Sequence, residues 1–183
     1  MGGIVVPYCT GSGHTRRLAE LVAEGAGGAA LIDVEAMGEA DWARIAAAEA
    51  VVFGAPTYMG GPAAGFKAFM DASGDLWLDQ GWKDKIAAGF TVATFPAGDK
   101  LSTLTQLAVF AAQHGMVWVG QAEIGAPARK DGGAVNGAGF WLGLAAASSR
   151  DKTRLIDEAD AETARRFGAR VAGAARRWAR GLV

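Results

Sequence analysis

Apolar runs and amphipathic segments alternate along the first two thirds of the chain. The runs at 4–6, 30–34, 50–54, 86–94 and 116–119 are predicted strands. Between them lie segments in which apolar residues recur three and four positions apart, as at Leu18, Leu21 and Val22, which indicates helices. Strands that are apolar throughout are typical of a parallel sheet buried on both faces. The pattern therefore predicts an α/β fold, an open doubly wound five-stranded parallel sheet with helices on both faces.

Glycine-rich turns follow the first, third and fourth predicted strands, at 8–15, 55–61 and 95–99. In a doubly wound sheet, ligands bind outside the carboxyl ends of the strands, and all three turns fall there. We expect Pro62 to lie in the first turn of the helix that follows the second of them. A ligand site is therefore predicted at this edge of the sheet.

The first turn joins a strand to a helix N-terminus, where free amides and the helix dipole favour an anion. Thr10, Ser12 and Thr15 can each donate a hydroxyl hydrogen bond to its oxygens, and Gly11 and Gly13 allow close approach to the backbone. Helix capping by Thr10 or Ser12 is the alternative, but it accounts for one hydroxyl and not for three. The turn is therefore predicted to bind a phosphate.

Three other phosphate loops match less well. A dinucleotide fingerprint needs a glycine where Arg16 stands, and the Gly-Lys-Ser/Thr of a nucleoside triphosphate loop is missing. A cysteine phosphatase loop has five residues between cysteine and arginine, but six separate Cys9 from Arg16. One residue of slip turns the arginine by about 100° around the helix. Cys9 is therefore predicted to be a small buried side chain.

Composition narrows the class of protein. The 183 residues are 51% apolar with a net charge of -1, which predicts one globular domain over residues 1–183. There is no apolar run of transmembrane length, no secretory signal and no strong basic excess, so we expect neither a membrane nor a nucleic-acid partner. The single cysteine suits a cytoplasmic location. No metal site is predicted.

The first turn resembles the FMN-phosphate loop of the flavodoxin-like flavoproteins, with hydroxyls at its first, third and sixth places and glycine at its fourth. Further segments are similar to the WrbA-type NAD(P)H:quinone oxidoreductases and occur in the same order. They are Gly54–Tyr58 with Gly60, Phe66–Asp71, Gly74–Trp77, His114–Val117 and the stretch from Ala145 through the last predicted helix. The resemblance thus covers nearly the whole chain and implies a flavodoxin-like fold.

The resemblance implies that FMN places its phosphate on residues 10–15 and its ring between the turns at 57–59 and 94–99. The FMN-binding residues it implies are Thr10, Gly11, Ser12, Gly13, His14, Thr15, Pro56, Thr57, Tyr58, Met59, Thr94, Phe95, Pro96, Ala97, Gly98, Asp99 and His114. Trp77 and Ser12 are expected beside the substrate. Core packing is an alternative role for Tyr58 and Trp77, and His114 also suits the C-terminal end of a helix dipole. No side chain is assigned as a catalytic acid or base, because the flavin carries the chemistry.

The implied function is an FMN-dependent enzyme that passes two electrons from NAD(P)H to a quinone. The alternatives are a flavodoxin-type electron carrier and a non-enzymatic flavin-binding regulatory protein. Carriers typically dock through a strongly acidic face, so the net charge of -1 favours the enzyme. The family also implies a homo-oligomer, a dimer or tetramer, for which the irregular stretch 123–144 is a candidate interface.

Overall fold

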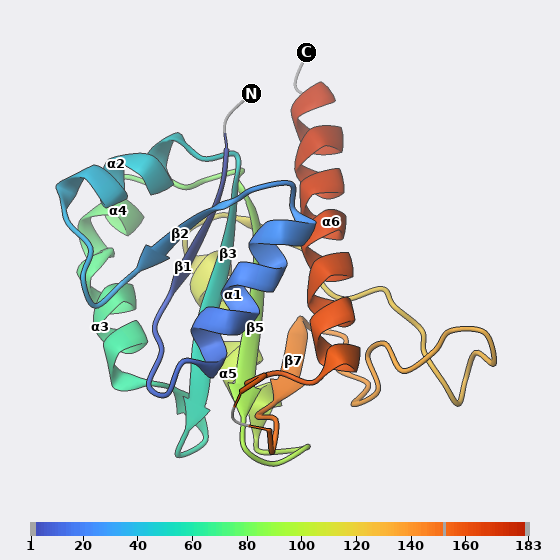
Figure 1. Ribbon diagram of the computed structural model, residues 1–183. Helices are drawn as coiled ribbons and strands as arrows, with labels where there is room; N and C mark the ends of the chain where they lie inside the picture. Colours follow the sequence, from blue (N-terminus) through green and yellow to red (C-terminus); the bar gives the residue numbers. More distant parts are fainter. Residues whose placement is uncertain (1–2, 152, 182–183) are drawn as a thin grey trace.

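The apolar strands form a parallel sheet in a computed structural model that describes residues 3–151 and 153–181 (Figure 1). The strand order is β2-β1-β3-β5-β6. The first four of these are β2 (Ala30–Asp33), β1 (Ile4–Tyr8), β3 (Ala50–Tyr58) and β5 (Ile86–Ala93). The predicted doubly wound parallel sheet is confirmed.

Helices cover both faces of this sheet. α1 (His14–Gly25) and α6 (Glu158–Arg180) lie side by side on one face, where Leu18 and Phe167 are fully buried (Figure 1). α2 (Glu39–Ala47), α3 (Ala64–Ala72) and α5 (Lys100–Gln113) cover the other. There Phe66 and Phe110 pack around Phe53 of β3, and the short helix α4 (Gly74–Leu78) follows α3. Because β2, β1, β3 and β5 pair in parallel, their carboxyl ends all lie at one edge of the sheet.

The second glycine-rich turn is a β-hairpin, so the expectation that Pro62 begins a helix is wrong. β3 continues to Tyr58 and pairs antiparallel with β4 (Gly61–Pro62), and α3 begins only at Ala64. Met59 and Gly60 connect the two strands with φ of 48° and 81°. Positive φ at both central residues is the signature of a type I′ hairpin turn, and glycine at the second position favours it.

Two separate segments share the fifth position of the sheet. β6 (Val117–Trp118), the centre of the predicted strand at 116–119, pairs with Ile86 and Ala87 at the start of β5. β7 (Leu144–Ala147), which the sequence did not predict as a strand, pairs with residues 90–93 at the end of β5. An irregular segment connects β6 and β7. Near its end, the Leu142 carbonyl accepts a hydrogen bond of 2.7 Å from the Trp118 indole of β6.

Two features are absent from the part of the chain that the structure describes. None of the helices is long and apolar enough to cross a membrane. Nor do histidine, cysteine, aspartate and glutamate side chains gather there in a group of three or more that could hold a metal ion.

Candidate functional site

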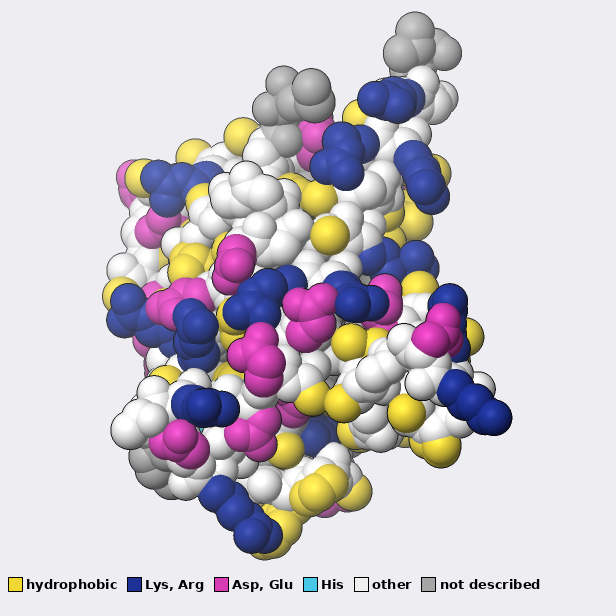
Figure 2. Space-filling view, turned by 45° about the vertical axis from the view of Figure 1, so that its right-hand side comes forward, with side chains coloured by type: hydrophobic (Ala, Val, Ile, Leu, Met, Phe, Trp, Pro, Cys, Tyr) yellow, Lys and Arg dark blue, Asp and Glu magenta, His cyan; other side chains and the backbone are white. Residues whose placement is uncertain are grey.

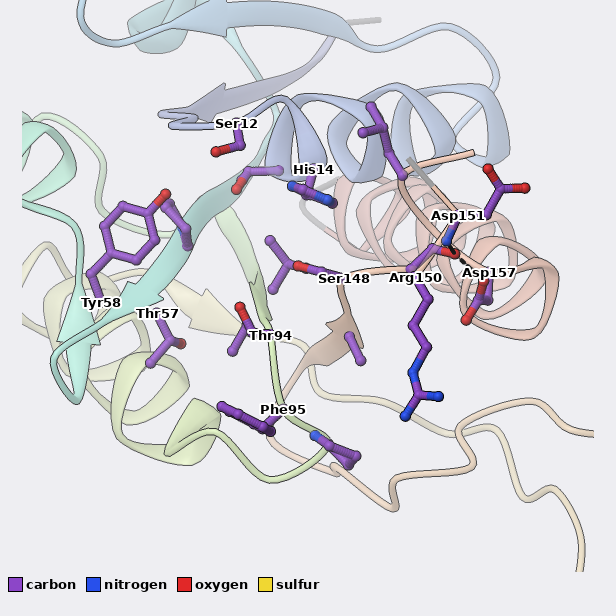
Figure 3. A pocket seen from close by; sticks show the side chains of 18 residues that line it. Ser12, His14, Thr57, Tyr58, Thr94, Phe95, Ser148, Arg150, Asp151 and Asp157 are labelled. Carbon is purple, nitrogen blue, oxygen red and sulfur yellow. Dashed lines mark hydrogen bonds between the residues drawn. The ribbon is translucent and has the colours of Figure 1, made fainter. Parts of the chain in front are cut away.

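A cleft of about 1130 Å³ lies at the carboxyl edge of the sheet (Figure 3). The first helix, the ends of β3 and β5, and the chain after β7 form its walls. Nine of the predicted site residues line it: Ser12, His14, Thr15, Pro56, Thr57, Tyr58, Thr94, Phe95 and Pro96. The structure thus brings the three predicted turns together around one cavity.

The loop before α1 has the features of an anion cradle. Gly13 occupies the N-cap position with φ 87°, a conformation that glycine adopts without strain. The Thr10 hydroxyl oxygen accepts hydrogen bonds from the amides of Gly13, at 3.2 Å, and Arg16, at 3.4 Å. Its single hydrogen therefore remains available to a ligand. Capping, the alternative considered for Thr10, and phosphate binding are compatible at this residue.

Gly11 lies against the Tyr58 ring from the opposite wall. A Cβ atom at position 11 would overlap the Tyr58 hydroxyl. In Figure 3 this hydroxyl points toward the loop that carries Ser12. Tyr58 is nevertheless 51% exposed, so its ring does not belong to the core. The core-packing alternative for Tyr58 therefore does not hold in this structure.

Large apolar side chains stand in solvent around the cleft. Phe95 is 72% exposed on the turn after β5, and Met59 is fully exposed at the tip of the β3–β4 hairpin. Clustered exposed apolar groups commonly mark a ligand-binding groove. Together with Tyr58, they give the cleft the character of a site for a flat aromatic ring.

Thr57 lines the cleft, but its hydroxyl is used inside the protein. It makes hydrogen bonds of 2.8 Å to the hydroxyls of Thr91 and Thr103, which joins β3, β5 and α5. Thr91 and Thr103 are fully buried. These bonds fix the floor between two walls of the cleft and leave Thr57 to contact a ligand through its backbone and methyl group.

A fourth wall, which the sequence analysis missed, follows β7. Its residues are Ala147, Ser148, Ser149, Arg150, Asp151, Leu155 and Asp157. The Ser149 hydroxyl and the Asp157 carboxylate are 2.5 Å apart, and the Asp151 amide donates to the same hydroxyl oxygen at 3.1 Å. Hydrogen bonds from the hydroxyl and amide of Thr153 lower the pKa of Asp151. The sequence signal that could have predicted this wall is the polar turn that follows the apolar run 142–147.

Comparisons with known proteins identify the family. Residues 33–131 match the model of the NADPH-dependent FMN reductases. The chain is 38% identical over 180 residues to "Flavodoxin FldP" of Pseudomonas aeruginosa, covering 94% of this chain and 96% of that protein. The chain belongs to the NADPH-dependent FMN reductase family.

Two further relatives refine this assignment. A crystal structure of "the flavodoxin, WrbA-like protein from Agrobacterium tumefaciens" is 40% identical, with a TM-score of 0.78, and the match covers 97% of this chain and 99% of that one. An "NAD(P)H dehydrogenase (quinone)" of Geobacter metallireducens is 31% identical over 143 residues, which is 64% of this chain and 70% of that protein. The chain is thus a flavodoxin-like flavoprotein of the WrbA type.

The residues at the cleft fit FMN, the cofactor that the family supports. A phosphate fits the loop before α1, where Gly13 leads into the helix N-terminus, the Thr10 hydroxyl keeps its hydrogen for a ligand, and Ser12 lines the cleft. The aromatic ring fits the side on which Tyr58 and Phe95 are exposed. The cavity of about 1130 Å³ is large enough for a cofactor of this size, since ligand pockets measure roughly 300–1,000 Å³.

Two predicted site residues lie away from the cleft. Trp77 and His114 line a separate pocket of about 310 Å³ between α3, α4 and α5, which shares no lining residue with the cleft. His114 follows the C-terminal end of α5, a helix of 14 residues and therefore roughly 20 Å long, whose N-terminal end is the one near the cleft. Within one chain, the structure does not bring either side chain to the cleft.

The surroundings of His114 are those of a packed residue at a helix end. The Ser73 hydroxyl donates to the Met70 carbonyl at 2.8 Å, so at 2.9 Å His114 Nε2–H is the donor to Ser73. The ring also packs on Trp82 with centroids 4.4 Å apart. Burial lowers the pKa of His114, so the surroundings disfavour the protonated ring that the helix-dipole alternative needs.

Three more of the predicted residues flank the cleft without lining it. Ala97, Gly98 and Asp99 complete the turn before α5, where Gly98 and Asp99 have φ of 51° and 53°. Cys9 is buried as predicted, and burial first, then the Glu35 charge, raises the pKa of its thiol to about 12. Since a thiolate is the nucleophile in a cysteine phosphatase, the buried Cys9 thiol with its raised pKa argues against that alternative.

Proposed function

We propose that the protein is an FMN-dependent oxidoreductase that passes two electrons from NAD(P)H, through FMN in the cleft, to a quinone. The observation that carries the proposal is the cleft itself, which joins a phosphate cradle at Gly11 and Gly13 to exposed aromatic side chains at Tyr58 and Phe95. The family description names NADPH as reductant, and several relatives carry the name NAD(P)H dehydrogenase (quinone).

In this proposal the residues of the chain bind FMN and orient its ring. Thr10, Ser12 and Thr15 would donate to the phosphate together with the amides of the first helical turn. Tyr58 and Phe95 would cover the ring and exclude water from it. Bound FMN supplies the hydride and electron chemistry. No acid or base is required from the protein at the reacting atom, and none is assigned.

Arg150 is a candidate for holding the nicotinamide nucleotide. It is the one lysine or arginine among the described residues that line the cleft, and its guanidinium makes no hydrogen bond or ion pair with the described chain. In Figure 3 it extends from the wall opposite Tyr58 along the open side. A free guanidinium at this place suits a phosphate group of NAD(P)H, because arginine binds phosphates bidentately.

An electron carrier is the second candidate, favoured by the relative named Flavodoxin FldP. The surface charge argues against it. Figure 2 shows lysine and arginine side chains interspersed with aspartate and glutamate on the face over α1 and α6, and not one acidic field. Arg165 and Arg166 of α6, for example, pair with Glu24 and Glu123.

Two measurements separate these functions. The FMN-loaded protein is mixed with NADH or NADPH and a panel of benzoquinones and naphthoquinones, and nucleotide oxidation is followed. Sustained turnover with at least one pair supports the enzyme. Reduction of the bound FMN by a flavodoxin reductase, with no turnover by either nucleotide alone, would replace the enzyme by the carrier.

We propose a homo-oligomer, a dimer or tetramer, on the family resemblance, with the excursion at 123–144 as its interface because Ile124 and Trp141 are 50% and 54% exposed there. A cytoplasmic location is proposed from the single free cysteine. Light scattering of the FMN-loaded protein tests the first.

A further inference from the structure

Lys100 is a fully buried lysine in an unfavourable place. It is 1% exposed and is the first residue of α5, where the helix dipole disfavours a cation. Burial lowers its pKa, and the nearby Asp160 charge opposes that shift. A charge in such a position persists only when it is paired and hydrogen-bonded, so its partners indicate what it does.

The partners of Lys100 and Asp160 meet at a single peptide group. Lys100 Nζ donates to the Ala146 carbonyl at 2.9 Å, and Asp160 Oδ2 accepts from the Ala147 amide at 2.9 Å. These are the two polar ends of the peptide bond between Ala146 and Ala147. The cation lies at the negative end of the peptide dipole and the carboxylate at its positive end, so both charges are stabilised by the group that they hold.

This peptide group lies at the end of β7, where the fourth wall of the cleft begins with Ala147. Among the described strands β7 pairs with β5 alone, so its other edge needs partners from outside the sheet. The Asp160 carboxylate supplies one, and the Phe140 ring lies 5.5 Å from Lys100 Nζ. After Ala147 the chain runs directly into the cleft-lining residues 148–151.

Lys100 and Asp160 also lie next to other segments that form the cleft. Lys100 follows directly on the turn 94–99, whose first three residues line the cleft. Asp160 lies in the first turn of α6, one turn after Asp157, which bonds Ser149 of the fourth wall. Lys100 and Asp160 therefore tie together three chain segments that are separate in sequence and adjacent in the cleft.

We propose that Lys100 and Asp160 are positioning residues of the flavin site, which hold the Ala146–Ala147 peptide and thereby set the fourth wall against the ring of FMN. The inference rests on the proposed function in one respect, that FMN binds in this cleft. Neither side chain lines the cleft, so both act through the wall and not by contact.

Lys100→Met tests the proposal, with Lys85→Met as its matched control. Lys85 is also partly buried, with its pKa lowered by burial, and donates to the carbonyls of Ala46 and Ala48 at 2.6 and 2.7 Å. It precedes β5, at the end of the sheet opposite the cleft. Both variants lose a lysine that binds backbone carbonyls, but only Lys100→Met alters the wall.

The dissociation constants of FMN and of riboflavin, which lacks the phosphate, are measured for each variant by flavin fluorescence. Lys100→Met is expected to weaken both ligands by about tenfold, the loss of one hydrogen bond from a charged group. Lys85→Met is expected to change both by less than twofold. Weakening of FMN with riboflavin unchanged would overturn the proposal, because it would show charge attraction to the phosphate and not positioning.

Hydrogen exchange of the ligand-free variants gives a readout that does not depend on flavin. Lys100→Met is expected to raise exchange in 144–151 and to leave β1 unchanged. Should that variant not fold, Lys100→Met with Asp160→Asn carries no buried charge and keeps an acceptor for Ala147. It is still expected to weaken riboflavin several-fold. Unchanged exchange and unchanged affinity in a folded variant would refute the positioning role, whereas wild-type protein that binds no flavin would refute the proposed function.

Discussion

The hydroxyls of Ser12 and Thr10 allow binding of the FMN phosphate to be separated from the stability of the fold. Ser12 is exposed and makes no hydrogen bond with the described chain, so Ser12→Ala is expected to change the free energy of unfolding by less than about 0.5 kcal/mol. Thr10 accepts from two amides at 3.2 and 3.4 Å, which are long bonds. Thr10→Ala is therefore expected to cost about 0.5–1 kcal/mol of stability.

The effect on FMN is larger, because each hydroxyl would donate to a charged phosphate. A hydrogen bond to a charged group contributes about 1.5–3 kcal/mol, so either substitution raises the FMN dissociation constant by about 10- to 150-fold. Two such bonds at the lower value give about 3 kcal/mol, or about 150-fold, for the double variant. The sum of two bonds at the upper value is not expected, because the two hydroxyls would bind the same phosphate and their contributions are then not additive.

Isothermal titration of each variant with FMN and with riboflavin is the assay. Riboflavin has no phosphate, so its affinity is expected to be the same in wild type, both single variants and the double variant. Thr105→Ala, which removes an exposed hydroxyl bonded to the Leu101 carbonyl, is the matched control and keeps full FMN affinity. Equal losses for FMN and riboflavin, or no loss for FMN, would refute the assignment of the phosphate to this loop.

Three further outcomes are expected. Gly13→Ala is expected to lower the free energy of unfolding, measured in urea, by about 1–2 kcal/mol, because φ is 87° at this position. Gly11→Ala is expected to lower it little, since the exposed Tyr58 ring can move away from the added methyl group. Equal losses for the two variants would contradict this. Because burial lowers the pKa of His114, the unfolded chain takes up a proton below about pH 6.5 that the folded chain resists, so stability is full above that pH and falls below it. His114→Gln is expected to reduce that loss between about pH 7 and pH 5.5, and an unchanged slope would contradict it. Arg150→Ala is expected to raise the KM for NAD(P)H several-fold with kcat unchanged, as for lost ground-state binding, and a fall in kcat alone would contradict the role given to Arg150.

Local sequence patterns predicted the parts of the fold that rest on local interactions. The strands β1, β2, β3 and β5 contain continuous apolar runs, as expected for a parallel sheet covered on both faces, and the loop at 10–15 has the glycines and hydroxyls that its geometry uses. Pro62 was misplaced because the propensity of proline for a first helical turn was outweighed by the Met59–Gly60 turn.

The fourth wall depends on tertiary contacts that a sequence pattern does not contain. β7 is the alanine-rich run Leu144–Ala147, which has low strand propensity and becomes a strand by pairing with residues 90–93 after a long excursion. Lys100 looks like a solvated helix residue in the sequence, and only the fold brings Ala146 and Asp160 to it. The separate location of His114 follows in the same way from the length of α5, and Trp77 of α4 lines the same separate pocket.

Anaerobic stopped-flow absorbance of the FMN-loaded protein tests the central claim most directly. The visible flavin band is followed on mixing with NADPH or NADH, and then on mixing with benzoquinone in a second push. The account predicts that the band is lost with at least one nucleotide and returns with the quinone, each faster than for free FMN at the same concentration. A band that neither nucleotide changes, or that the quinone does not restore, would contradict the proposal that this cleft carries electrons from NAD(P)H to a quinone.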